Sequence, residues 1–232
     1  MCELIRECNN LLRDCEFPYA FCGGYALELF LDKYLRPHGD IDVFTFEDDR
    51  KSMVAYILNK GYNVYIRTGH MKLNLVTDSE DLRLIDHSQI WAIKPLCSLI
   101  RLDPIDGEKN AFIYDVLNEE QNNIDFIDIF FSARENENYI CDNHKNITRD
   151  LSKAILYNDG VPYLAPEIKL FYDSNPRYME LDYFKHKNHI DFESTAPFLL
   201  EESKNWLICA LERKYPEGNK RIEQLKNMKR TV

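Results

Sequence analysis

The sequence FCGGYALELFLDKYLRPHGDIDVFTF occupies residues 21–46, and its pattern decides the fold expected for the chain. An apolar strand is expected over residues 17–22, and the glycine pair Gly23-Gly24 follows it. Apolar residues at helical spacing predict a helix over 25–35. The run VFTF predicts a second strand, with Asp40-Ile41-Asp42 at its head. The stretch therefore predicts a strand, a helix and a second strand in succession.

Each part of this stretch suits the binding of a phosphate and its metal ions. Gly23 and Gly24 let the backbone approach a bulky anion, and the helix start after them offers free N–H groups and the positive end of the helix dipole. Asp40 and Asp42 are two residues apart on a strand, so both carboxylates project from one face. Paired carboxylates suit one or two magnesium ions, which prefer oxygen ligands and also bind substrate phosphates.

The lengths of the segments allow these parts to meet. A helix over 25–34 rises about 15 Å. Residues 36–42, if extended, return by up to roughly 23 Å. The chain can therefore bring Asp40 and Asp42 back beside the glycine turn.

In order and spacing, the stretch resembles the nucleotidyltransferase superfamily, which has the polymerase-β-like fold. The string GGYALELFLDKYLRPHGDID is similar to the branch of aminoglycoside and lincosamide nucleotidyltransferases, where a glycine pair, an aromatic residue, a helix, Arg-x-His and Asp-Ile-Asp recur. The resemblance implies an enzyme that moves a nucleoside monophosphate, first of all AMP from ATP, to a hydroxyl of a small molecule. It implies that two magnesium ions bind Asp40 and Asp42, and that Gly23, Gly24, Arg36 and His38 lie at the nucleotide.

The resemblance also implies a third carboxylate on a later strand, which completes the metal site or takes the proton of the attacking hydroxyl. The run NIDFIDIFF at 123–131 predicts that strand and offers Asp125 and Asp128. Residues three apart on a strand lie on opposite faces, so at most one of the two points at the site. We favour Asp128, which is flanked by apolar residues within the strand, while its alternative is a capping or edge carboxylate.

The C-terminal part carries two further matches to this branch. The run VPYLAPE at 161–167 resembles a helix start of the family, and Lys187 with Asp191-Phe192 resembles its Lys-x-x-x-Asp-Phe segment, which implies a phosphate contact for Lys187. Glu167 is either a site residue or a carboxylate favoured by the helix dipole. Asp173 departs from the family, which has a lysine there, and this puts the nucleotide preference in doubt.

The expected fold is α+β, a mixed nucleotidyltransferase sheet flanked by helices with a helical C-terminal part. The division expected is a catalytic domain over 1–159 and a helical domain over 160–232. Segment 97–120 is expected to be an irregular insertion because it carries Asp-Pro and Asp-Gly turn signals. The other elements expected are helices over 3–15, 50–59, 197–214 and 219–229, and strands over 62–67, 72–76, 82–85 and 89–93.

Composition and missing motifs exclude several other classes. With 232 residues, a net charge of −10 and a pI of about 5.1, the chain lacks the basic surface that non-specific nucleic-acid binding needs. Its seven cysteines include no CxxC pair and are expected to be reduced. A signal peptide and a membrane span are not expected, so the location expected is the cytoplasm. P-loop, HExxH and GxSxG motifs are absent from the sequence.

Two alternative functions stay open at this stage. One is a toxin-like transferase that modifies tRNA or protein, although the acidic balance disfavours tRNA. The other is a nucleotide-binding regulatory module without turnover, which the departure at Asp173 would fit. The intact Gly23-Gly24 pair and the Asp40/Asp42 pair favour the enzyme. No residue singles out the acceptor, which we expect to be a small molecule, or the oligomeric state.

Overall fold

The computed structural model describes residues 1–118, 120–141 and 144–228, and its segments form two units that alternate along the chain. Unit 1 combines Met1, Cys22–Leu35 and Arg134–Val232, while unit 2 combines Cys2–Phe21 and Arg36–Ala133. Each unit is described by itself. In the described part of the chain, every helix is too short or too polar to span a membrane.

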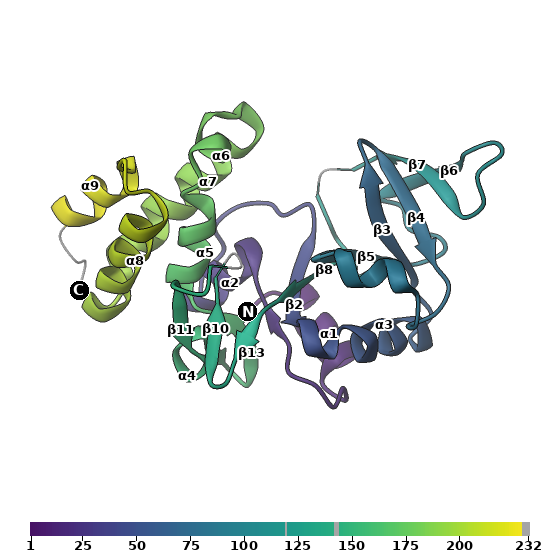
Figure 1. Cartoon of the computed structure of the whole chain (residues 1–232), viewed down its shortest axis with the longest axis horizontal. Helices are drawn as coiled ribbons and strands as arrows, with labels where there is room; N and C mark the ends of the chain where they lie inside the picture. Colours follow the sequence, from purple (N-terminus) through teal and green to yellow (C-terminus); the bar gives the residue numbers. More distant parts are fainter. Residues whose placement is uncertain (119, 142–143, 229–232) are drawn as a thin grey trace. The chain divides into compact units, whose positions relative to one another are not determined.

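A mixed β-sheet forms the body of unit 2 (Figure 1). Its strand order within the unit is β1-β2-β8-β5-β3-β4-β7-β6. Strands β2 and β8 run parallel, and the other neighbours in this order pair antiparallel. In sheet order the bounds are β1 (Ala20–Phe21), β2 (Ile41–Phe46), β8 (Phe126–Ser132), β5 (Gln89–Ile93), β3 (Asn63–Gly69), β4 (Lys72–Val76), β7 (Ala111–Val116) and β6 (Ile100–Pro104).

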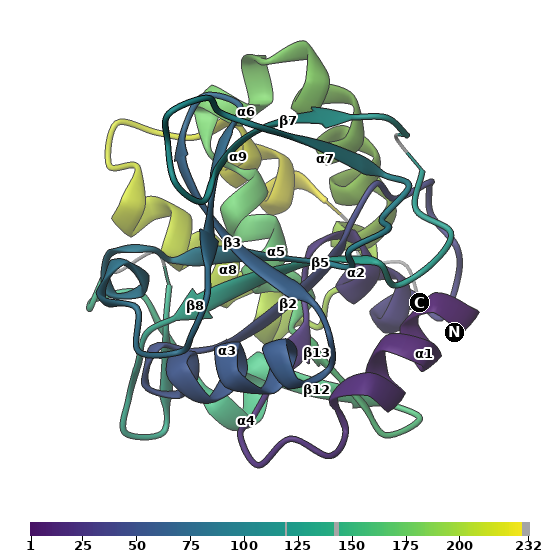
Figure 2. The ribbon, with the colours of Figure 1, turned by 90° about the vertical axis from the view of Figure 1, so that its right-hand side faces the viewer.

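Two helices, α1 (Glu3–Leu12) and α3 (Arg50–Asn59), cover one face of this sheet (Figure 2). Helix α3 packs on β2 and β3, and the two helices are joined where the Tyr56 hydroxyl donates to the Leu11 carbonyl. The Arg50 guanidinium of α3 lies 4.8 Å from the centroid of the Phe131 ring. Because strand residues alternate between faces, Asp128 lies on the face of β8 opposite Phe131 and α3.

The opposite face of the sheet carries an aromatic cluster. The Trp91 ring packs edge-on against Tyr114 at 4.9 Å and against Phe126 at 5.1 Å between centroids. Tyr65 and Leu73 belong to the same buried cluster. Edge-to-face contacts of this kind add to the stability that burial alone gives, so this half of the sheet is rigidly packed.

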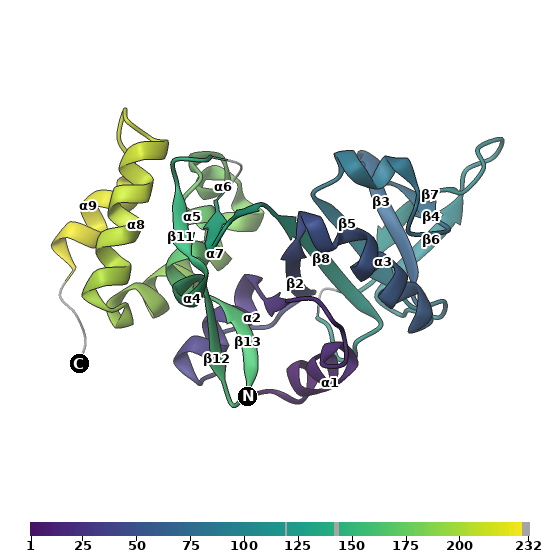
Figure 3. The ribbon, with the colours of Figure 1, turned by 60° about the horizontal axis from the view of Figure 1, so that its bottom comes forward.

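Unit 1 is mainly helical, with α5 at its centre in contact with α2, α7 and α8 (Figure 3). A hairpin of β12 (Ile155–Asn158) and β13 (Val161–Leu164) turns at Asp159-Gly160 and leads into α5, where Pro166 occupies the first turn. The helices are α2 (Gly23–Leu31), α4 (Leu151–Ala154), α5 (Pro166–Asp173), α6 (Pro176–Glu180), α7 (Asp182–Thr195), α8 (Glu201–Lys214) and α9 (Lys220–Asn227), with the 3-10 turn η3 (Ala196–Phe198). A small sheet adds β9 (Arg134–Glu135), β10 (Asn138–Ile140) and β11 (Thr148–Asp150).

The structure corrects two sequence-based expectations in unit 2. Segment 97–120 is not irregular in its described part: β6 and β7 form an antiparallel pair, and the Asp-Gly signal falls in the turn between them. Both strands are partly exposed, and the run AFIYDV of β7 lacks the alternation of apolar and polar residues by which a strand is predicted. Segment 82–85 is not a strand but part of the 3-10 helix η2 (Leu82–Asp86), because the Asp81 side chain caps it by accepting from the Arg83 N–H.

Several other elements begin or end at other residues than expected, among them the helix expected over 3–15, which ends at Leu12. The strand expected over 17–22 is confined to β1, and α2 begins at Gly23 and ends at Leu31, where Asp32 adopts a left-handed conformation. The helix expected from Pro197 begins at Glu201, after the 3-10 turn. Residue 229 of the last expected helix lies outside the described residues. The division into domains at 159/160 stays a prediction.

Ile57 should show how much the contact between α3 and the sheet contributes to stability. Its side chain is fully buried, so Ile57→Ala is expected to lower the free energy of unfolding by about 3 kcal/mol. The matched control is Leu96→Ala, which truncates a side chain that is 94% exposed and should change it by less than about 0.5 kcal/mol. Urea titration measures both, and equal midpoints would contradict this packing.

Candidate active site

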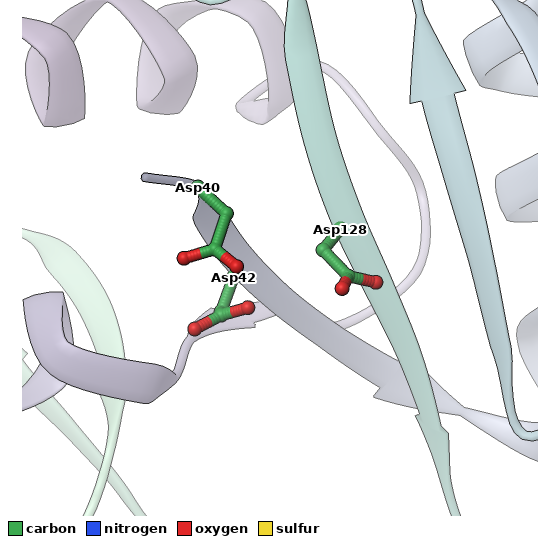
Figure 4. A group of neighbouring side chains, drawn as sticks. All are labelled: Asp40, Asp42 and Asp128. Atoms are coloured by element: carbon green, nitrogen blue, oxygen red, sulfur yellow. The ribbon is translucent and has the colours of Figure 1, made fainter. Parts of the chain in front are cut away.

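Three aspartates meet on one face of the sheet in unit 2 (Figure 4). Asp40 stands directly before β2, Asp42 lies in β2 and Asp128 lies in the neighbouring strand β8. Each offers a carboxylate oxygen, and these oxygens all lie within 4.8 Å of one another. Asp128 is buried, whereas Asp40 and Asp42 are half-buried. The arrangement therefore concentrates negative charge at one point.

The strand pairing explains why these side chains converge. In the parallel pair of β2 and β8, Asp42 stands level with Asp128, so both side chains leave the sheet on the same face. Asp40 is two residues before Asp42 and projects in the same direction. Asp125 precedes β8 and does not belong to this carboxylate group. Of the two candidates for the third carboxylate, the structure thus places Asp128 beside Asp40 and Asp42.

The electrostatic state of Asp128 fits a ligand for a cation. Burial, and after it the Asp42 carboxylate, raises the pKa of the Asp128 carboxyl well above its usual range. The Gln89 carboxamide Nε2 donates a hydrogen bond to Oδ2 of Asp128 at 2.5 Å. The other oxygen, Oδ1, is buried and accepts no hydrogen bond from the described residues. Three convergent carboxylates with a buried unsatisfied oxygen are the donor set that a hard divalent cation prefers.

Gln121 joins the segment before β2 to the segment before β8, and no sequence pattern singled this residue out. Its backbone N–H donates to the His38 carbonyl at 2.8 Å. Its side-chain Nε2 donates to the carbonyls of Asn123 and Phe126, both at 2.6 Å. Gln121 is buried, so it fixes the entry to β2 relative to the entry to β8.

Arg36 and His38 are in contact with each other in the loop before Asp40. The Arg36 guanidinium lies 3.3 Å from Nδ1 of His38, and the His38 side chain is buried. These contacts order the loop that delivers Asp40 and Asp42 to the edge of the sheet. A direct contact of either residue with a nucleotide stays a prediction.

The glycine pair begins helix α2 in unit 1. Gly23 has a φ of 60°, a left-handed conformation that favours glycine. Cys22 precedes the helix and its side chain forms no capping hydrogen bond, which suits an N-terminus that binds an anion. The roles of Gly23, Gly24 and Lys187 at a nucleotide stay predictions.

Glu167 and the departure at Asp173 have structural explanations within unit 1. The Glu167 carboxylate pairs with the buried Arg149 guanidinium at 2.6 Å and accepts from the Ser203 hydroxyl at 2.9 Å. The ammonium of Lys169, one helical turn before Asp173, pairs with Asp173 and lies 3.5 Å from Asp191. Lys169 therefore places a positive charge at both of these carboxylates.

Comparisons with known proteins found a matching family model and similar solved structures. A family model described as Aminoglycoside-2''-adenylyltransferase matches residues 4–94. The structure is similar to the crystal structure of the lincosamide antibiotic adenylyltransferase LnuA with lincomycin bound, with a TM-score of 0.50 and 11% identity, over 84% of this chain and 98% of that chain.

The chain has a nucleotidyltransferase fold. The similarity to the LnuA structure confirms the expected α+β class and the fold that the resemblance of residues 21–46 implies.

Two further structures are more distant matches, and no curated protein matches the sequence. The solution structure of the antibiotic-resistance factor ANT(2'')-Ia has a TM-score of 0.46 and 15% identity over 92% of each chain. A crystal structure of ANT(2'')-Ia in complex with adenylyl-2''-tobramycin has a TM-score of 0.46 and 14% identity, over 90% of this chain and 98% of that chain.

The raised pKa of Asp128 has a consequence for stability. A carboxyl whose pKa is higher in the folded than in the unfolded chain loses folding free energy as the pH rises from its unfolded pKa towards its folded pKa. Asp128→Asn removes this penalty, so it should raise the Tm of the metal-free protein at pH 7 by a few degrees. The control Asp125→Asn should leave the Tm unchanged. Differential scanning calorimetry at pH 7 and pH 4 measures the effect, and a lower Tm for Asp128→Asn at pH 7 would contradict it.

Proposed function

We propose that this protein transfers AMP from ATP, with magnesium, to a hydroxyl group of a small antibiotic. The observation that carries this proposal is the group of Asp40, Asp42 and Asp128 on the pair β2–β8 of a nucleotidyltransferase fold. The family match over 4–94 supports an aminoglycoside acceptor, and the similarity to a lincosamide enzyme adds lincosamides as a second class. Nothing in the comparisons supports a tRNA-modifying, protein-modifying or purely regulatory role.

The aspartates are the residues that would hold the metal. Asp40 and Asp42 lie on one strand end and Asp128 lies level with Asp42, so their oxygens converge without rearrangement of the sheet. Bound magnesium would neutralise charge on the triphosphate and lower the pKa of the acceptor hydroxyl. Gln89 holds Oδ2 of Asp128 and so leaves its buried Oδ1 as the oxygen for a ligand.

The backbone of the glycine pair is the proposed binding site for the β- and γ-phosphates. Phe21, the last residue of β1, pairs with Val43, which directly follows Asp42, and Gly23 comes two residues after Phe21. Free N–H groups at the start of α2 would donate to phosphate oxygens. Lys187 is proposed to add a cation to the phosphates.

The reaction then balances as a displacement at the α-phosphorus. The acceptor oxygen forms a bond to this phosphorus, the bond to the bridging oxygen of the β-phosphate breaks, and pyrophosphate leaves with the electron pair. The hydroxyl proton passes to a base, for which we propose Asp128, because its carboxylate lies beside Asp40 and Asp42 on the face of the sheet where the acceptor would meet the α-phosphate. A cytoplasmic location, where ATP is supplied, completes the proposal.

The first test is transfer of label from α-labelled ATP, GTP, CTP and UTP with magnesium to a panel of aminoglycosides and lincosamides. The wild type should label a drug, with ATP as the best donor. Asp40→Asn/Asp42→Asn should lower the rate by about 10³-fold or more, since it removes the groups that hold several kcal/mol of charge stabilisation. Asp103→Asn, an exposed aspartate of β6, is the control. A double variant as active as the control would refute the site.

The glycine turn can be tested separately from the aspartates. Gly23→Ala is expected to weaken binding of magnesium-ATP by about tenfold or more, because a side chain at the left-handed φ strains the turn that presents the N–H groups. Gly160→Ala is the matched control: its φ is 78°, with open space around an added Cβ, and it lies in the β12–β13 turn. Titration with a fluorescent ATP analogue compares the two, and equal affinities would rule out a phosphate role for Gly23.

A further inference from the structure

A polar pocket in unit 2 adjoins Asp128. It has a volume of about 340 Å³ and is lined by Arg67, Gly69 and residues 86–89. This lies at the low end of the range of about 300–1,000 Å³ for ligand pockets, so it has room for one ring rather than a whole antibiotic. Gln89 belongs to both sites, because it lines the pocket while its carboxamide donates to Oδ2 of Asp128.

Arg67 is positioned in this pocket by stacking on aromatic rings. Its guanidinium carbon lies 5.5 Å from the Trp91 ring centroid and 6.0 Å from that of Tyr114. Trp91 stands level with Asp128 in the antiparallel pair of β5 and β8, so Arg67 lies on the same face of the sheet as the carboxylates. A stacked guanidinium keeps its in-plane N–H groups for another acceptor, and none of the described carboxylates pairs with it.

The pocket offers donors and acceptors together, with little net charge. Arg67 donates, Asp86 accepts, and Ser88 and Gln89 do both. This mixture matches the neighbouring hydroxyls of a sugar, each of which donates and accepts. A ring with several ammonium groups would instead bring like charge to the Arg67 guanidinium.

We propose that this pocket is a subsite for a neutral, polyhydroxylated ring of the acceptor, and that Arg67 selects such a ring over a polycationic one. The inference rests on the proposed function, since it assigns the pocket to the acceptor of that reaction, and of the two acceptor classes proposed there it favours the lincosamides over the aminoglycosides. Because Gln89 spans the pocket and Asp128, a ring seated there presents its hydroxyls next to the proposed base.

Binding without nucleotide tests the pocket independently of turnover. The probes are lincomycin, whose sugar ring carries hydroxyls and no ammonium group, and tobramycin, a polycation. In NMR spectra of the full chain, lincomycin should shift the Gln89 carboxamide and His87 ring signals. Arg67→Ala should weaken lincomycin binding about tenfold, the effect of losing a charged hydrogen bond, and should not weaken tobramycin binding. Arg101→Ala, an exposed arginine of β6, is the matched control and should behave as wild type.

Turnover gives a second readout on the same variants. Arg67→Ala should raise the KM for lincomycin about tenfold, with the KM for ATP unchanged and kcat within about threefold. The inference is overturned if lincomycin leaves the Gln89 and His87 signals in place, if Arg67→Ala changes its affinity less than about twofold, or if tobramycin binds the pocket as tightly as lincomycin. Absence of transfer with the lincomycin shifts intact would contradict the proposed function but not the pocket.

Discussion

The parallel pairing of β2 with β8 is the constraint on which the candidate site depends. Asp42 and Asp128 are 86 positions apart in the numbering, yet the register sets them level on one face of the sheet. Parallel strands need a long connection, and here the connection supplies α3 and the strands β3 to β7. The segment between the two aspartates therefore returns the chain beside β2 in the register that sets them level.

That register brings carboxylates of like charge together, which is unfavourable for the stability of the fold. Asp128 is buried with the Asp42 carboxylate as a neighbour, and its pKa rises for both reasons. A chain selected for stability alone would gain by losing one of these charges, because buried carboxylates without a counter-ion are unfavourable. Hydrogen bonds from uncharged side chains keep the aspartates in place despite this repulsion. Gln89 donates to one oxygen of Asp128, and Gln121 joins the segments before β2 and β8 through three hydrogen bonds to backbone carbonyls. Strain of this kind is typical of a site prepared for a cation.

Charge pairing within unit 1 accounts for a residue that departs from the expected pattern. The resemblance drawn from the sequence implies a lysine where this chain has Asp173. In the structure Lys169 occupies the preceding turn of α5 and pairs with Asp173 and Asp191. Residues four apart on a helix share one face, so Lys169 lies on the face of α5 that carries Asp173 and close to Asp191. Glu167, by contrast, is engaged by Arg149 and Ser203, and its partners explain its burial.

The sequence by itself determined the glycine turn, the helix after it and the Asp40/Asp42 pair, because strand and helix periods and turn chemistry are local properties. It also indicated the nucleotidyltransferase fold through the order of those parts. It left open whether Asp125 or Asp128 joins them, and it missed the β6–β7 pair, Gln121, Gln89 and Lys169. Only the tertiary structure decided these points. Each depends on strand register, on a half-exposed pairing or on hydrogen bonds between distant residues, and such contacts leave no periodic trace along the chain.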